Sequence, residues 1–145
     1  MQISKELLSK KLDFLNEQIR KIENMEFSEQ DFVRDLDIHD LVVFRLQQAV
    51  ETCIDIATHI IAATDAPRKE TARDAFEYLG EKGIIGRELS LKMGKASDFR
   101  NRVVHGYNDF DFKLLFKDYR QDLKDLRQFG AEVLKYMESP IIVIS

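Results

Sequence analysis

The sequence predicts an all-α protein, an up-and-down bundle of four to five helices that forms a single domain over residues 1–145. Three observations lead to this prediction: apolar residues recur at helical spacing through long segments, only 6 Gly and 2 Pro occur among 145 residues, and no linker or internal repeat divides the chain. Hydrophobic residues make up 44% of the chain and charged residues 33%, which is typical of a folded protein with one core.

The N-terminal half is expected to contain two long helices. The first covers about residues 4–25, and its apolar positions are three or four residues apart: Leu8, Leu12, Leu15, Ile19 and Ile22. Ser28, with Asp31 three residues later, has the spacing of a helix start and predicts a short helical turn. The second long helix covers about residues 38–63. Its apolar stripe is wide and continuous, so we expect it at the centre of the bundle.

The C-terminal half is expected to contain three further helices. Pro67 ends the preceding pattern, and a shorter helix follows over about residues 69–81. Helical turns resume over about residues 87–104, with an interruption near Gly94 left open. The last helix covers about residues 111–138 and carries a regular apolar stripe.

The net charge of −4 argues against broad electrostatic binding to nucleic acid, but the charge is unevenly distributed. Residues 82–105 include six Lys or Arg residues and only two acids, Glu88 and Asp98. A basic surface on an acidic body favours the binding of anions at one place. The single cysteine, Cys53, cannot form an internal disulfide, and no segment resembles a signal peptide or a membrane span, so we expect a cytoplasmic protein.

Residues 100–107, RNRVVHGY, hold most of the chemistry that the sequence offers. The guanidinium of Arg100 has the planar fork that binds phosphate oxygens, and the imidazole of His105 titrates near neutrality. Tyr107 adds a hydroxyl that can be modified. Five helical residues place Arg100 and His105 about 140° apart, so they would not share one face of a regular helix. Gly106 is expected to cap this helix and so let the imidazole swing.

Less specialised roles for the same residues stay open. Arg100 can be an ordinary ion-pairing residue, His105 a surface cap and Tyr107 a packing aromatic, because helix ends commonly carry basic residues.

A second group of polar residues lies on the second long helix. Asp55 and His59 are four residues apart and could pair with each other or supply two metal ligands, but no third ligand lies at a suitable spacing. Asp55 is also a candidate support for a basic residue of the site, since it lies between two isoleucines. Cys53 is expected in the core rather than as a nucleophile. The sequence therefore predicts no metal site and no cofactor.

The segment RNRVVHGY resembles the signature of the HEPN superfamily, specifically of its HepT-like toxin branch: Arg, four to six residues, His, any residue, Tyr, with a polar residue after the Arg. Arg100, Asn101, His105 and Tyr107 occupy these places with the four-residue spacing. The resemblance implies a homodimer whose two motif segments face each other in a shared cleft. It also implies a metal-independent RNA endonuclease, the toxin of a type VII-like toxin–antitoxin pair. Its partner would be an MntA-type nucleotidyltransferase antitoxin that transfers AMP to Tyr107.

The resemblance also implies roles for the polar residues of the motif. Arg100 is expected to grip the scissile phosphate, His105 to move a proton, and Asn101 to orient the substrate or the imidazole. Nearby basic side chains are expected to bind the flanking RNA backbone: Arg102, Lys95 and Lys92.

Two functions of other classes are the alternatives. One is a non-catalytic nucleotide- or substrate-binding subunit of a nucleotidyltransferase, in which the motif binds phosphates without cutting. The other is a dimeric interaction module, in which the motif binds neither RNA nor nucleotide.

Overall fold

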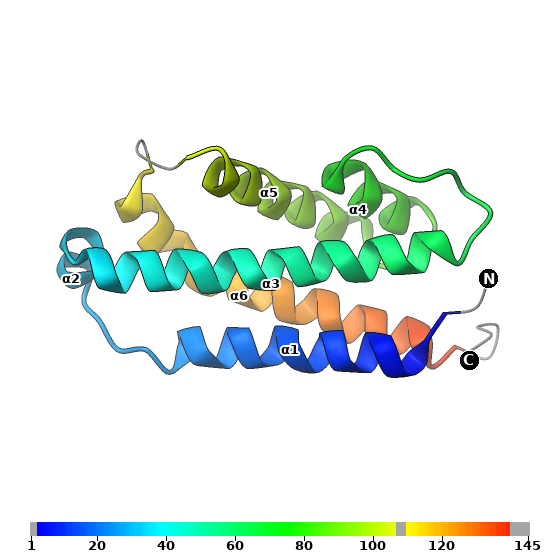
Figure 1. Cartoon of the computed structure of the whole chain (residues 1–145), viewed down its shortest axis with the longest axis horizontal. Coiled ribbons are helices and arrows are strands. Elements are labelled where there is room, and N and C mark those ends of the chain that lie inside the picture. Colours follow the sequence, from blue (N-terminus) through cyan, green and yellow to red (C-terminus); the bar gives the residue numbers. More distant parts are fainter. Residues whose placement is uncertain (1–2, 107–109, 140–145) are drawn as a thin grey trace.

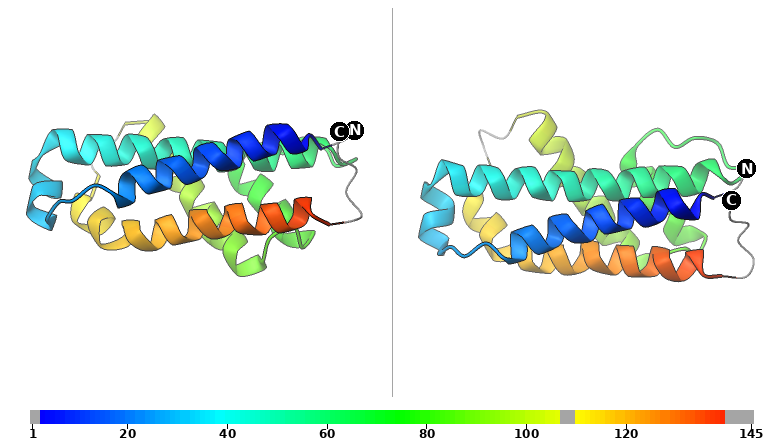
Figure 2. Two further views of the ribbon diagram at one scale, coloured as in Figure 1. Left: turned by 90° about the horizontal axis from the view of Figure 1, so that it is seen from below. Right: turned by 60° about the horizontal axis from the view of Figure 1, so that its bottom comes forward.

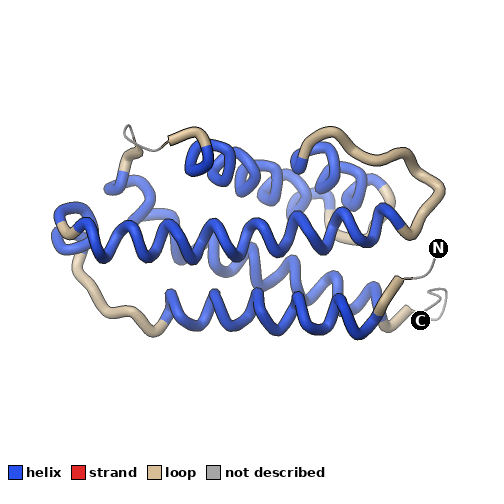
Figure 3. Tube along the Cα trace, in the orientation of Figure 1, coloured by secondary structure: helices blue, strands red, loops and turns tan. Residues whose placement is uncertain are grey.

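Within residues 3–106 and 110–139, which the computed structural model describes, the chain forms six α-helices and no β-strand (Figure 3). In chain order they are α1 (Lys5–Glu23), α2 (Glu29–Arg34), α3 (Leu36–Ala62), α4 (Ala72–Glu81), α5 (Arg87–Val104) and α6 (Phe112–Met137). The predicted all-α bundle is confirmed. The number of helices is one higher than predicted, because the turn that starts at Ser28 is a separate helix, α2.

The long helices run up and down, as predicted. α3 runs antiparallel to α1 and to α5, and α6 runs antiparallel to α5 (Figure 1). α1, α3 and α6 pack against one another, while α4 and α5 lie together on one side of α3 (Figure 2). Every other helix packs against α3, which confirms its predicted central position.

Capping side chains explain where the helices begin. Asp35 Oδ1 accepts the backbone N–H of Asp37 at 2.9 Å, so α3 begins two residues before the predicted start. Thr71 Oγ1 accepts the N–H of Asp74 at 3.0 Å, so α4 begins at Ala72 and not at residue 69. Gly94 does not interrupt α5, and its missing side chain leaves room for the guanidinium of Arg73. These boundaries depend on local hydrogen bonds rather than on apolar periodicity.

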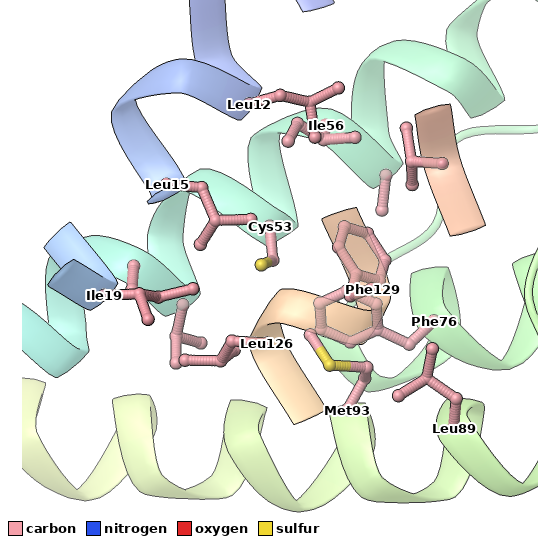
Figure 4. Close-up of a cluster of buried hydrophobic side chains, with 14 of the residues drawn as sticks. Leu12, Leu15, Ile19, Cys53, Ile56, Phe76, Leu89, Met93, Leu126 and Phe129 are labelled. Atoms are coloured by element: carbon pink, nitrogen blue, oxygen red, sulfur yellow. The ribbon is translucent and has the colours of Figure 1, made fainter. Parts of the chain in front are cut away.

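The core forms where the apolar sides of the helices meet, and Figure 4 shows part of it. Residues from α1, α3, α4, α5 and α6 contribute, among them Leu15, Ile56, Phe76, Met93 and Phe129. Cys53 is fully buried in this core, and its burial raises the pKa of the thiol, so it is a packing residue as expected. No helix within residues 3–106 and 110–139 is long and apolar enough to cross a bilayer.

A chain of aromatic rings joins the start of α3 to the end of α5. The buried ring of His39 stacks on Phe112 with centroids 3.8 Å apart, and its Nδ1 lies 2.9 Å from the carbonyl oxygen of Phe32. Phe112 stacks on Phe110 at 5.8 Å, and Phe110 meets Phe99 of α5 edge to face at 5.5 Å. These contacts hold the end of α5 against the start of α6.

The close approach of α4 and α5 gives a stability prediction. A Cβ atom at Gly80 would lie 2.6 Å from Cβ of Ser90, too close for any real contact. We therefore expect Gly80→Ala to lower the free energy of unfolding by about 1–3 kcal/mol, although Ala favours helix more than Gly does. Urea unfolding followed by circular dichroism measures the change.

Gly130→Ala in α6 is the matched control for this substitution. A Cβ atom there would make ordinary contacts with Leu15 and Leu12 at 3.4 and 3.5 Å, so we expect stability to rise by up to about 1 kcal/mol. Equal stability of Gly80→Ala and the wild type would contradict the close approach of the two helices.

Candidate active site

The motif forms the last turns of α5 and the residues that end the helix. Arg100, Asn101 and Arg102 are helical, and His105 is the C-terminal cap, with its backbone N–H donating to the carbonyl oxygen of Asn101 at 3.0 Å. Gly106 follows with a φ of 101°, a conformation that favours glycine. The predicted end of the helix is therefore confirmed. Tyr107 lies outside the residues that the structure describes.

Arg100 points toward α3 and is held there by a carboxylate. Its Nη1 donates a hydrogen bond to Glu51 Oε1 at 2.9 Å, and the two side chains are 23% and 34% exposed. The Nε atom of Arg100 is buried and finds no hydrogen-bond partner among the described residues. A guanidinium has five N–H donors, so the bond to Glu51 leaves most of them for another anion.

Glu51 is the site residue that sequence reasoning missed. Asp55, one turn further along α3, was a candidate support for a basic residue of the site, and this interpretation is wrong because Asp55 pairs with Lys11 of α1 at 3.7 Å. Both Glu51 and Asp55 are acids in the most apolar helix, but Glu51 is followed by Thr52, so a position between two apolar residues indicated Asp55 alone. Which of the two faces α5 depends on how α3 is rotated in the bundle.

His105 and Asn101 lie exposed at the end of α5. The imidazole of His105 makes no hydrogen bond or ion pair with any residue of 3–106 or 110–139, and neither does the amide of Asn101. Arg100 is thus tied to α3 while His105 extends from the helix end. Within one copy of the chain, no hydrogen bond joins the two groups.

Arg102 lies on a different side of α5 from Arg100. Its guanidinium carbon lies 5.0 Å from the ring centroid of Phe110, in a groove of about 400 Å³ between α3, α5 and α6. Lys95 and Lys92 line the same groove. The Nζ of Lys92 is 3.7 Å from a carboxylate oxygen of Asp125 on the opposite wall. The groove therefore brings together the three basic residues that were expected to bind RNA backbone.

The α6 wall of this groove is acidic. Asp118, Asp122 and Asp125 lie one turn apart along α6, and all three line the groove. Asp122 is exposed as a residue, but desolvation of its carboxylate in the groove wall raises its pKa to about 6, and the neighbouring carboxylates of Asp118 and Asp125 add to the shift. The groove is thus basic along α5 and acidic along α6.

The second candidate pair on α3 does not form a metal site. His59 Nε2 accepts the backbone N–H of Ser4 at 3.3 Å, and Asp55 pairs with Lys11 instead of with His59. Among the described residues no three potential ligands come together around one point. Both side chains connect α3 to the N-terminal part of the chain.

The acidic wall gives a pH-dependent prediction. Because the pKa of Asp122 is about 6 in the folded protein and near 3.8 otherwise, the folded state keeps a proton that the unfolded chain has lost. Stability therefore falls as the pH rises from about 4 to about 6, and the full cost is present above pH 6. We expect Asp122→Asn to raise the free energy of unfolding at pH 8 by about 1 kcal/mol, after allowance for solvent screening of this exposed group.

Urea unfolding of this variant and the wild type at pH 8 and pH 5 measures the effect, and the gain should shrink at pH 5. Asp13→Asn, on the exposed face of α1, removes the same charge away from the cluster and serves as control. A gain for Asp122→Asn that is equal at the two pH values would contradict the shifted pKa.

Similarity to known proteins agrees with this geometry. The chain is 28% identical over 130 residues to the mRNA nuclease HepT of Shewanella oneidensis, and the match covers 90% of this chain and 97% of that protein. It is 33% identical over 133 residues to the tRNA nuclease HepT of Aphanizomenon flos-aquae, with 91% and 86% covered. The solved structure of the tri-AMPylated Shewanella oneidensis HEPN toxin in complex with MNT antitoxin superposes with a TM-score of 0.82 at 26% identity, covering 88% of this chain and 96% of that chain.

A sequence model of the family described as ribonuclease HepT-like matches residues 15–133. The matched region includes the whole of α5, its capping residue His105, and the acid Glu51 that holds Arg100. The motif, the helical bundle and the family match agree, and the chain belongs to the ribonuclease HepT-like family.

Proposed function

We propose that this chain is a metal-independent RNA endonuclease, the toxin of a toxin–antitoxin pair, with Arg100 and His105 as catalytic residues. One observation carries the proposal: in a ribonuclease family, α5 ends with a guanidinium held by Glu51 and an exposed imidazole at the helix terminus. The mRNA and tRNA nucleases among the relatives support RNA as the substrate class.

The chemistry requires one anion-binding group and groups that move protons. Arg100 binds the scissile phosphate and stabilises the charge of the pentacoordinate transition state. His105 takes the proton from the 2′-hydroxyl, the 2′-oxygen attacks phosphorus, and the bond from phosphorus to the 5′-oxygen breaks. A second imidazole donates a proton to that leaving oxygen, and the products are a 2′,3′-cyclic phosphate and a 5′-hydroxyl. Asn101 orients the substrate or the imidazole.

A second copy of the chain supplies that second imidazole. Support comes from exposed apolar side chains near the motif, since Phe44 is 55% exposed and Val104 is 56% exposed. Phe44 lies seven residues before Glu51 on α3, and Val104 lies four residues after Arg100 on α5. Because the two helices are antiparallel, both side chains lie beyond the same end of the ion pair, on the helix faces that carry it. A symmetric dimer through this surface would cover both side chains and bring two motif segments together.

The basic residues of the groove bind the RNA backbone on one side of the phosphodiester bond that is cleaved. Arg102 and Lys95 lie along α5 beside the motif, and their positive charge attracts flanking phosphates. Lys92 can join them by leaving Asp125 and Glu88, because its ammonium lies 3.7 and 3.9 Å from these carboxylates, which is long for an ion pair.

Control of the nuclease is proposed to act at Tyr107. A nucleotidyltransferase of the MNT type transfers AMP to its hydroxyl, and the added phosphate and bulk next to His105 repel and exclude RNA. Support comes from the related HEPN toxin, which is AMPylated and in complex with an MNT antitoxin. Both proteins would act in the cytoplasm, where RNA is the available target.

The catalytic assignment makes a direct prediction. Arg100→Ala and His105→Ala are each expected to reduce RNA cleavage in EDTA by at least about a hundredfold, because each removes a group needed in the transition state. Gel analysis of labelled RNA, with phosphatase treatment to identify cyclic-phosphate ends, measures the loss. Circular dichroism and size-exclusion chromatography check that fold and dimer are retained.

Arg87→Ala, at the opposite end of α5, is the control and should cleave like the wild type. Cleavage by both motif variants at the wild-type rate in EDTA would refute the assignment. Wild-type protein that binds nucleotides tightly but cuts no RNA would instead favour the non-catalytic subunit of a nucleotidyltransferase.

Control by the partner makes a second prediction. Incubation with the cognate nucleotidyltransferase and ATP should add one or more AMP units to the wild-type chain and none to Tyr107→Phe, as measured by intact mass. The modified wild type should lose RNA cleavage, and Tyr107→Phe should keep it. Modification of Tyr107→Phe to the same extent would place AMP on another residue.

A further inference from the structure

A cavity lies beside Arg100 on the side of α5 that faces away from the groove of Arg102. It has a volume of about 360 Å³ and is enclosed by the C-terminal half of α3, the connection 63–71 and the first turns of α4, with Arg100 in its wall. Figure 1 shows this connection and α4 on the same side of α3 as α5. The volume is at the lower end of the range for small-ligand sites, about 300–1,000 Å³.

The cavity combines an apolar wall with a cationic rim. Ile54 and Ile61 of α3 supply the apolar wall, three and ten residues after Glu51 on the helix that holds the guanidinium of Arg100. Arg68 and Lys69 lie on the rim opposite, and Glu70 is the one acid that lines the cavity within the described residues. A flat apolar base and a negatively charged phosphate are the two parts of a nucleotide that such walls accept.

The two cationic side chains of the rim differ in the contacts that they make with the rest of the protein. The ammonium of Lys69 lies 4.6 Å from the ring centroid of Tyr78, which fixes its position at the rim. Arg68 is exposed and makes no hydrogen bond or ion pair with any residue in 3–106 or 110–139. Arg68 therefore has a complete guanidinium fork to offer to a phosphate.

We propose that this cavity binds one nucleotide of the RNA strand next to the scissile phosphate. The base lies against Ile54 and Ile61, and Arg68 binds the phosphate on the far side of that nucleotide. Arg100 lies between this cavity and the phosphodiester bond that is cleaved. Its guanidinium therefore borders both the bound nucleotide and the reacting phosphate. The inference rests on the proposed endonuclease, since it assigns the substrate unit that its site binds.

Electrostatics separates this cavity from the groove on the other side of α5. The α6 wall of the groove carries Asp118, Asp122 and Asp125, and these carboxylates repel phosphates that enter deeply. Three cations and one acid line the cavity, Arg68, Lys69 and Arg100 with Glu70, and the carboxylate of Glu51 compensates Arg100, so the cavity keeps a net positive charge. We therefore expect one nucleobase of the RNA to bind inside the cavity. The groove on the other side of α5 is expected to contact only RNA phosphates, through the Lys and Arg residues along α5.

The test measures binding separately from cleavage. In the full-length His105→Ala background, where RNA stays intact, the dissociation constant for a short fluorescent single-stranded RNA is measured by anisotropy at several salt concentrations. Arg68→Ala should raise this constant about fivefold to tenfold and reduce the salt slope by about 0.7, the loss of one phosphate contact. Arg68→Lys should restore part of the affinity.

A second variant tests occupation of the cavity without removing charge. Thr58 is exposed on α3 and lines the cavity, so Thr58→Phe places a ring in it without disturbing the core. We expect this variant to weaken RNA binding by a similar factor while the salt slope stays unchanged. Arg20→Ala on α1, on the opposite side of α3, removes one positive charge elsewhere and should leave affinity unchanged.

Competition with free AMP distinguishes a nucleotide of the RNA strand from a free nucleotide as the occupant of the cavity. AMP should bind weakly, and Thr58→Phe should weaken AMP and RNA alike. If Thr58→Phe affects only AMP, the cavity serves a free nucleotide and the inference is overturned. It is also overturned if Arg68→Ala and Thr58→Phe bind RNA like the parent, or if the parent binds no RNA. If these variants lose RNA binding but the wild type cuts no RNA, the proposed nucleotide site is supported and the proposed endonuclease activity is refuted.

Discussion

The ion pair between Arg100 and Glu51 connects the reactive end of the molecule to its core. Glu51 lies on α3, against which every other helix packs, so the guanidinium is positioned by the most constrained element of the bundle. An ion pair at this exposure adds little to stability, and its main effect is orientation. Apart from the buried Nε, the N–H donors that Glu51 leaves unused are ready to bind a second anion at small reorganisation cost.

α5 separates two surfaces of different charge, and Arg100 and Arg102 lie on different sides of it. Arg100 borders the cavity with Arg68 and Lys69, whereas Arg102 lies over Phe110 in the groove whose α6 wall is acidic. An acidic body with basic surfaces limited to this region disfavours loose contact with RNA elsewhere. In the proposed endonuclease, this distribution of charge would direct RNA to the end of α5, although the net charge of the chain is negative.

Local features of the site could be predicted from the sequence, and contacts between helices could not. The end of α5 near His105 depends on nearest neighbours along the chain and was predicted correctly, although the capping residue is His105 and Gly106 follows it with a positive φ. The partner of Arg100 depends on the rotation of α3 about its axis, and it is Glu51, one helical turn before the candidate support Asp55. The cavity beside Arg68 is formed by three segments distant in sequence, and no local pattern indicates it.

The sequence by itself determined the helical class, the approximate extent of each long helix, the central place of α3, and the motif that identifies the family. Apolar periodicity and motif spacing are properties of consecutive residues, so they can be read without a fold. Only the tertiary structure decided that Glu51 holds Arg100, that Arg102 turns to the other side of α5, and that His105 stays exposed. Those outcomes depend on how helices rotate and pack against one another, because side chains on one helix meet partners that the chain places tens of residues away.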